Sequence, residues 1–476
     1  MLDILILHGF VITMEGRGLG IIEDGAVGIK GNKIEVVGVS GEIQKEYSAH
    51  RVIDAENKVV MPGLIDAHTH TGIGLIRGVS QDLKNLMQQG IWPFEELLRK
   101  DVDASVKGSA VNIIEAVKAG TTTFCDYDYP MSEIVKNHEK IGTRARVADL
   151  INELPPDSSK VKVGDLYPLD PASGNRKLQE NIRLIEEWNG RDDGRITCML
   201  GPQGPDMVSK ELLLEIRSLA EKYDTQIHMH VAQGNREINQ MVKRYGKRSI
   251  AYLDEIGMLN SRLLAVHLTE ATPEETRTVA RSGAAMILCS GSIGIIDGLI
   301  PPAAEFLEVS DRLALGSDQT PGNNCSNMFN EMKFTAILNK CKARTPDVFP
   351  AHQVLKMATI KAARAIGLGD EIGSLKEGKK ADVILIDLLS PNLSPVIHTP
   401  VRNIIPNLVY SAKGSEVETV IIDGKVVVDN KVLTTVDERK AVLEANAAAK
   451  RIADQAAAKF ATMETPLKDW MAEGNL

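Results

Sequence analysis

The sequence predicts an α/β protein: a (β/α)8 TIM barrel with a small β-sandwich built from the N- and C-terminal segments. Eight short apolar runs alternate with segments of helical period 3.6 between Val59 and about Gln319, which matches such a barrel in number and in size. Strand-like runs also stand before and after this region. A doubly wound open sheet is the alternative, but it would collect polar residues at one switch point, whereas here they recur at the ends of at least four runs.

Residues 1–60 are expected to form the first part of the sandwich, because short β-type runs are broken there by turn residues. The pair Gly31-Asn32 is typical of a tight hairpin turn. Residues 61–365 are assigned to the barrel. Its eight expected strands read VVMPGLIDAHTH, TTTFCDY, RARVADL, RITCMLGP, TQIHMHVAQ, LLAVHLT, AAMILCSGS and RLALGSDQT.

Strand-like sequence returns in residues 366–435, in ADVILIDL and VETVIIDGKVVVDN, and we expect these strands to complete the sandwich beside the barrel. Residues 436–476 are rich in alanine and prone to form helix. This C-terminal tail is expected to serve packing or oligomer formation rather than catalysis.

Composition favours a small-molecule substrate. The chain has 476 residues, a formal net charge of −9 and no block of like charge, which argues against a nucleic-acid partner. No apolar run approaches the roughly 18 residues needed to span a bilayer, and the first ten residues lack the basic start of a signal peptide, so a cytoplasmic protein is expected. Five widely spaced cysteines without a C-x-x-C pair indicate reduced thiols rather than disulfides or a zinc ribbon.

Histidines and one aspartate stand where the barrel strands end, which is where working residues of such barrels lie. His68 and His70 end the first strand, and as residues i and i+2 they point to the same side. His230 ends the fifth strand, His267 the sixth and Asp318 the eighth. Three of these imidazoles together with the carboxylate suit one divalent metal ion, with Zn²⁺ preferred and Fe²⁺ as the alternative. Such an ion would ionise a bound water, which becomes the nucleophile.

One metal ion is expected rather than two, because bridged dinuclear barrels use a lysine on the fourth strand and RITCMLGPQ has none. His228 shares a face with His230 but lies deeper in the strand. We interpret it as a packed, hydrogen-bonded neighbour rather than a fifth ligand, since four protein groups already fill the site. The other histidines have no motif around them and are interpreted as structural or surface residues: His8, His50, His138, His352 and His398.

The chain resembles the amidohydrolase superfamily, in particular its triazine hydrolases and its nucleoside and base deaminases. The resemblance covers the chain nearly end to end and rests on these motifs: PGLIDAHTH, GIWPFEE, AGTTTFCD, HVAQ, VHLTEATPEE, GSDQTPGNNCSNMFNEMK and ATIKAARAIGLGDEIGSLKEGKKADVILID. It implies a metal-dependent hydrolase, and commonly a dimer or larger homo-oligomer.

The resemblance also implies roles for single residues. It makes His68, His70, His230 and Asp318 the metal ligands. Asp318 would take a proton from the metal-bound water and pass it to the leaving group, and His267 would stabilise or help deprotonate that water. In the WPFE motif, Glu95 matches a position that contacts substrate in some deaminases of the group, and Trp92 is taken as substrate-binding with it.

Three places depart from the family. Gln233 replaces the glutamate of H-V-A-E, which protonates a ring nitrogen during attack, and a glutamine cannot supply that proton. Gln203 stands where many relatives have a substrate-holding histidine. The segment CSGSIGIIDG, residues 289–298, replaces a Pro-x-Ser-Asn turn.

Three functions therefore stay open. The first is hydrolysis of a C–N bond of a nitrogen heterocycle, by deamination or by removal of a substituted amine. The second keeps the metal mechanism but acts on an amide, urea, carbamate or carbon–halogen bond, where the neutral Gln233 would suffice. The third is a barrel that binds a ligand without catalysis.

Overall fold

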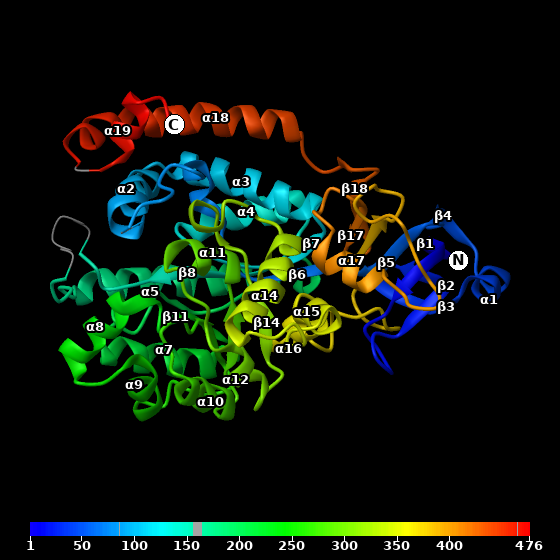
Figure 1. Ribbon diagram of the computed structural model, residues 1–476, viewed down its shortest axis with the longest axis horizontal. Helices are drawn as coiled ribbons and strands as arrows, with labels where there is room; N and C mark the ends of the chain where they lie inside the picture. Colours follow the sequence, from blue (N-terminus) through cyan, green and yellow to red (C-terminus); the bar gives the residue numbers. More distant parts are fainter. Residues whose placement is uncertain (85, 156–163, 464) are drawn as a thin grey trace.

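The computed structural model describes residues 1–84, 86–155, 164–463 and 465–476. Both ends of the chain enter one nine-stranded sheet, on the right in Figure 1, in the order β19-β18-β17-β16-β5-β1-β2-β3, with β4 paired to β1. Its strands are β1 (Leu2–Ile12), β2 (Ile21–Lys30), β3 (Lys33–Val39), β4 (Ala49–Asp54), β5 (Lys58–Pro62), β16 (Val383–Asp387), β17 (Val417–Ile422), β18 (Lys425–Asp429) and β19 (Val432–Leu433).

The N-terminal and C-terminal groups of strands in this sheet meet where β5 pairs antiparallel with β16, for example Val60 with Leu385. Apolar side chains from β1, β2, β5, β16 and β17 pack together on the inner side of this sheet. Gly31 has φ +59° in the two-residue turn between β2 and β3, a conformation that glycine adopts without the cost of a Cβ.

A closed ring of parallel strands forms the centre of the molecule, which confirms the barrel. Its eight positions are β6 (Leu64–His70), β7 (Thr121–Asp128), β8 (Arg144–Ile151), β9 (Ile196–Cys198) with β10 (Gly201–Pro202), β11 (Ile227–Val231), β12 (Leu263–His267), β13 (Ala285–Leu288), and β14 (Leu313–Leu315) with β15 (Asp318–Gln319). The bridge from Leu200 to Ile227 joins the fourth position to the fifth. Pairing of Asp318 with Thr69 joins the eighth to the first and closes the ring.

Helices surround the ring, and apolar side chains of the strands fill its interior. The start of α10 shows how the sequence fixes a helix boundary. Thr272 and Glu275 form a capping box there, with Pro273 in the first turn. The helices are α1 (Ser40–Glu46), η1 (Thr71–Ile76), η2 (Leu86–Ile91), α2 (Trp92–Lys100), α3 (Val102–Lys118), α4 (Met131–Ile141), α5 (Pro171–Trp188), α6 (Arg191–Gly194), α7 (Lys210–Lys222), α8 (Gly234–Tyr245), α9 (Ser249–Glu255), α10 (Pro273–Arg281), α11 (Ser290–Ile296), α12 (Ala303–Leu307), α13 (Thr320–Asn323), α14 (Met328–Ala343), α15 (Ala351–Met357), α16 (Ile360–Ala365), α17 (Ile404–Tyr410), α18 (Glu438–Thr462) and α19 (Leu467–Ala472).

The C-terminal helix α18 runs along α3 and over α2 (Figure 1, red). It buries the small and branched side chains of Ala445, Ala448, Ile452 and Ala456. Ile452 belongs to an apolar cluster that also contains residues of η1, η2 and α2. The tail therefore packs against the segments that follow the first barrel strand.

Within the described ranges, no helix has both the length and the apolar character needed to cross a membrane.

Candidate metal centre and substrate cavity

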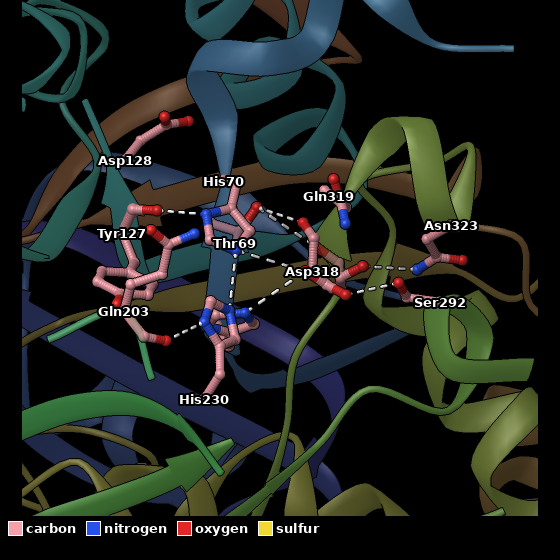
Figure 2. A network of polar contacts seen from close by, with 12 residues as sticks. Thr69, His70, Tyr127, Asp128, Gln203, His230, Ser292, Asp318, Gln319 and Asn323 are labelled. Atoms are coloured by element: carbon pink, nitrogen blue, oxygen red, sulfur yellow. Dashed lines mark hydrogen bonds and ion pairs between the residues drawn. The ribbon is translucent and has the colours of Figure 1, made fainter. Parts of the chain in front are cut away.

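Four barrel strands bring the predicted ligand residues together at one end of the ring (Figure 2). His68 and His70 come from β6, His230 from β11, His267 from β12 and Asp318 from β15. Ligand atoms of two triads lie within 4.8 Å of one another: His68, His230 and His267 in one, His68, His70 and Asp318 in the other. All five side chains are buried.

Backbone carbonyls set the orientation of two of these rings. His70 Nδ1 contacts the carbonyl oxygen of Tyr127, and His230 Nδ1 lies 2.7 Å from the carbonyl oxygen of Gln203. Because a carbonyl oxygen only accepts, each Nδ1 carries the proton and donates it, which leaves a lone pair on each Nε2. The two Nε2 atoms lie 3.3 Å apart, so both lone pairs are directed to the same small volume.

His228 stands behind His68. Its Nε2 lies 2.8 Å from His68 Nδ1, and it belongs to neither triad of ligand atoms. Burial is the main reason that the pKa values of both imidazoles lie well below their ordinary range. Both rings are therefore neutral, and His228 orients the Nε2 of His68 toward the centre.

Asp318 contributes the carboxylate. Its Oδ1 lies 3.4 Å from His68 Nε2 and 3.5 Å from His70 Nε2, and its Oδ2 accepts a hydrogen bond of 2.5 Å from the hydroxyl of Ser292. Asp318 has φ +60° and His267 has φ +78°, a left-handed conformation that non-glycine residues seldom adopt outside turns and functional sites.

Asp66, inside the DAHTH motif, anchors this arrangement. Its carboxylate accepts hydrogen bonds from the hydroxyl and the N–H of Ser317, 2.9 Å away for the N–H. The bond ties β15 to β6, and Asp318 is thereby held beside the two histidines of β6.

The residues present fit one divalent metal ion. Among the described residues, His68 Nε2, both ring nitrogens of His267 and Asp318 Oδ1 are buried without a hydrogen-bond partner. Unpartnered buried polar atoms are costly, and one cation among them would satisfy His68 Nε2, Asp318 Oδ1 and one of the two ring nitrogens of His267. Neutral imidazole nitrogens with one carboxylate oxygen are a donor set typical of catalytic metal sites.

A cavity opens beside His70 and His230, and the structure places all four of the other predicted site residues in its wall. These are Trp92, Glu95, Gln203 and Gln233. The side-chain amide of Gln233 makes no hydrogen bond to any other residue that the structure describes. By contrast, Gln203 Oε1 accepts a bond of 2.6 Å from Asn152, and Glu95 accepts one of 3.1 Å from Arg99 Nε. Gln203 therefore offers its N–H2 group to a ligand.

Sequence reasoning missed several charged residues that line the same cavity, among them Asp128, Asp206, Arg236 and Glu237. Asp128 ends β7, so the rule of polar residues at strand ends could have found it. Burial raises its pKa to about 6. The others lie on loops or on α8, and no sequence pattern marks them.

Glu237 holds the backbone of Gln233. Its two carboxylate oxygens accept hydrogen bonds from the N–H groups of Ala232, at 2.7 Å, and Gln233, at 2.8 Å. Burial, and then the charge of Asp206, raise the pKa of Glu237 to about 7. Ala232 and Gly234 both have positive φ, so Gln233 stands in a tight turn that Glu237 secures.

Comparisons with known proteins show which families and structures the chain is similar to. The model of the amidohydrolase family matches residues 59–427. A 5'-deoxyadenosine deaminase of Methanosarcina acetivorans is 37% identical over 467 residues, which cover 96% of this chain and 100% of that protein. A 5-methylthioadenosine/S-adenosylhomocysteine deaminase of Moorella thermoacetica is 33% identical, over 91% of this chain and 96% of that protein. The crystal structure of an adenosine deaminase from Xanthomonas campestris with bound zinc superposes with a TM-score of 0.85 at 29% identity, over 95% of this chain and 98% of that one.

Proposed function

The chain belongs to the amidohydrolase family, and we propose that its substrate is an adenosine nucleoside altered at the 5′ position, from which it releases the exocyclic amine as ammonia. It is a metal-dependent hydrolase acting on a C–N bond of a nitrogen heterocycle. The observation that carries the proposal is the convergence of unpartnered, buried imidazole nitrogens and a carboxylate oxygen beside His70 and His230, which line a cavity. The nearly full-length similarity to two deaminases of 5′-altered adenosines supports the substrate class.

We assign His68, His70, His230 and Asp318 as the ligands of one zinc ion, a choice supported by the zinc in the similar adenosine deaminase structure. Bound there, zinc would lower the pKa of a water molecule toward neutrality and thus supply a nucleophile. The carbonyl bonds of His70 and His230 hold their rings in the tautomer that binding needs.

Proton transfer is assigned to Asp318. Water adds to the ring carbon that bears the amine, the C–N bond breaks, and the leaving nitrogen must gain a proton. The carboxylate of Asp318 takes the proton of the attacking water and delivers it to that nitrogen, while the hydrogen bond from Ser292 to Oδ2 keeps the carboxylate in place. His267, whose ring stacks on His230 with an interplanar angle of 4°, is assigned to stabilise the nucleophile.

Gln233 is assigned to the ring nitrogen next to the reacting carbon. Its amide can donate a hydrogen bond and so polarise the ring, but it cannot transfer a proton. The chain thus relies on hydrogen bonding where a glutamate would protonate.

The proposal is tested with the zinc-loaded enzyme on 5′-deoxyadenosine and 5′-methylthioadenosine. We expect one ammonia for each inosine-type product, whose new oxygen comes from ¹⁸O-labelled water. His70→Ala and Asp318→Asn should abolish turnover and lower the bound zinc while the protein stays folded. His352→Ala is the matched control, since His352 is exposed on α15. Absence of ammonia from both nucleosides, or turnover by either ligand variant, would refute the assignment.

A second candidate is displacement of another leaving group, such as halide, from an electron-poor ring. Gln233 favours it, because such a ring needs no protonation before water attacks. Release of chloride from a chloro-substituted heterocycle, faster than release of ammonia from any adenosine, would select this function.

We also propose that the enzyme is a homo-oligomer acting in the cytoplasm. Support for assembly comes from a shallow apolar groove where β19 meets α18, in which Val432 is 64% exposed and Leu443 60%. All five cysteines are free, as expected of a reducing compartment. Light scattering should give at least twice the chain mass of 51.8 kDa, and cell fractionation should recover the enzyme with cytoplasmic markers.

A further inference from the structure

A second cavity adjoins the catalytic cavity. The two share Met87, Trp92, Gln233 and Arg236 in their walls. The remaining wall of the second cavity consists of Lys84, Leu86, Gly234, Asn235, Ile296 and Asp297. A substrate whose reacting ring lies beside the metal ligands and whose other end extends past Gln233 would place that end in this second cavity.

The carboxylate of Asp297 lies in the wall of this second cavity and has no partner among the described residues. It follows the last residue of α11, in the segment that departs from the family pattern. Its Oδ2 is buried, and among the described residues no hydrogen bond or ion pair reaches either oxygen. A Cβ on Gly234 would lie 3.3 Å from Oδ1, so the carboxylate lies against the backbone that follows Gln233.

The cations nearby are not paired with Asp297. Arg236 Nη1 lies 3.1 Å from Asp206 Oδ2 and 3.2 Å from the hydroxyl of Tyr167, so its hydrogen bonds go to residues other than Asp297. Lys84 forms no ion pair within 4.0 Å of Asp297 in the described part of the chain.

Burial and neighbouring negative charges make the carboxyl group of Asp297 less acidic. Burial raises the pKa of Asp297 to about 6; Arg236 opposes this rise, whereas Glu270 and Asp318 add to it. At neutral pH the group is thus largely ionised, and a buried anion without a partner is unfavourable until a cation or an N–H donor approaches it.

We propose that Asp297 forms a subsite for a positively charged, N–H-bearing substituent at the end of the substrate remote from the reacting carbon. The proposal rests on the proposed function, because it assumes that the reacting ring occupies the first cavity. An ammonium group there would donate hydrogen bonds to the free oxygens of Asp297, and the charge-assisted bond would favour it over a neutral substituent of similar size.

The test compares 5′-amino-5′-deoxyadenosine, which carries an ammonium group at neutral pH, with the neutral 5′-deoxyadenosine. For the zinc-loaded wild type, kcat/KM for the cationic nucleoside should exceed that for the neutral one. In Asp297→Asn the ratio of the two values should fall by about ten- to a hundredfold, because the variant keeps the shape and loses the charge. Asp297→Glu should retain part of the preference.

Glu270→Gln is the matched control. It removes a negative charge that acts on Asp297 from outside both cavities. The ratio of kcat/KM for the cationic nucleoside to kcat/KM for the neutral one should therefore stay within about twofold of wild type. An unchanged ratio in Asp297→Asn, or an equal loss for both nucleosides, overturns the subsite while leaving the deaminase function standing. Neither binding nor turnover of either nucleoside by the wild type, measured by calorimetry and ammonia release, overturns the proposed function and the subsite with it.

Discussion

At the scale of single residues, the proposed function makes Gln233 the hydrogen-bond partner of a ring nitrogen. Its amide faces the cavity, and its backbone is held by Glu237 in a turn between two positive-φ residues. The position is therefore rigid, and only the chemistry of the side chain differs from a glutamate. A glutamine donates to the nitrogen at every accessible pH, whereas a carboxyl group donates only while it is protonated.

Gln233→Glu should consequently accelerate ammonia release from 5′-deoxyadenosine, by up to about 100-fold, the usual scale of general acid catalysis. The variant should also lose activity as the pH rises through the pKa of the new carboxyl group, a dependence that the wild type lacks. The pH–rate profiles of kcat/KM measure both effects. Gln203→Glu is the control, because it adds a carboxylate to another part of the same wall. Identical profiles for Gln233→Glu and wild type would show that no ring nitrogen is protonated there.

His228 acts through its neighbour. Removing it in His228→Ala leaves His68 Nδ1 without the partner 2.8 Å away, and loss of such a partner typically weakens metal binding by about 10–100-fold. Competition with a zinc chelator measures this affinity, and denaturant unfolding measures the accompanying loss of stability.

His138→Ala is the matched control for that experiment. His138 is equally buried, but its ring bonds to Asp126 and Thr143, outside the metal triads. It should cost stability with no change in zinc affinity. An unchanged affinity in His228→Ala would leave His228 with a packing role alone.

At the scale of elements, the C-terminal helix α18 holds the helix that supplies Trp92 and Glu95. Arg451 lies 3.1 Å from Asp101 and 2.9 Å from Asp103, and Ile452 packs into the apolar cluster shared with α2. The ion pairs of the exposed Arg451 contribute little, so the apolar contact carries most of the attachment.

Ile452→Ala should loosen α2, because truncation of a buried isoleucine costs about 2–5 kcal/mol. We expect KM to rise with a smaller change in kcat, and amide hydrogen exchange to quicken in α2. Val442→Ala, on the exposed part of the same helix, serves as the comparison. If Ile452→Ala kept the wild-type KM and the wild-type rate of amide hydrogen exchange in α2, the C-terminal tail would not position the cavity wall.

At the scale of the whole molecule, buried imidazoles link folding to pH. Burial holds the pKa of His267 well below its ordinary value and lowers that of His230 to about 3. In the unfolded chain these rings take up protons as the pH falls through about 6.5, whereas in the folded chain they do not. Each ring therefore makes the free energy of unfolding fall as the pH drops below about 6.5. Buried carboxyl groups act in the opposite direction, because burial raises the pKa of Asp149 and Glu331 to about 8.

Comparing the wild type with His267→Asn separates the contribution of His267 from that of the buried carboxyl groups. Between about pH 6 and pH 5, the free energy of unfolding of the metal-free wild type should decrease with falling pH more steeply than that of His267→Asn, by up to about 1.4 kcal/mol per pH unit. Denaturant unfolding at several pH values measures the two slopes. Parallel slopes would mean that His267 already binds a proton in the folded metal-free protein.

The sequence by itself determined the fold class and the group of strand-end residues. Alternation of apolar runs with helical periods predicts a barrel, and in a barrel all strand ends face one side, so residues as distant as His68 and Asp318 could be grouped without coordinates. The terminal β-type runs likewise predicted one β-sandwich shared by both ends, because strand-like sequence returns after the barrel region.

Only the tertiary structure decided which partner each of these residues has. Ser292 bonds to Asp318, Glu237 secures Gln233, and Asp297 faces the second cavity unpaired. These contacts depend on the direction in which a side chain leaves a loop or a short helix, and periodicity describes only regular elements. The strand-end residues of the metal centre can therefore be found from the sequence, whereas the surroundings of Gln233 and Asp297 depend on how separate loops come together.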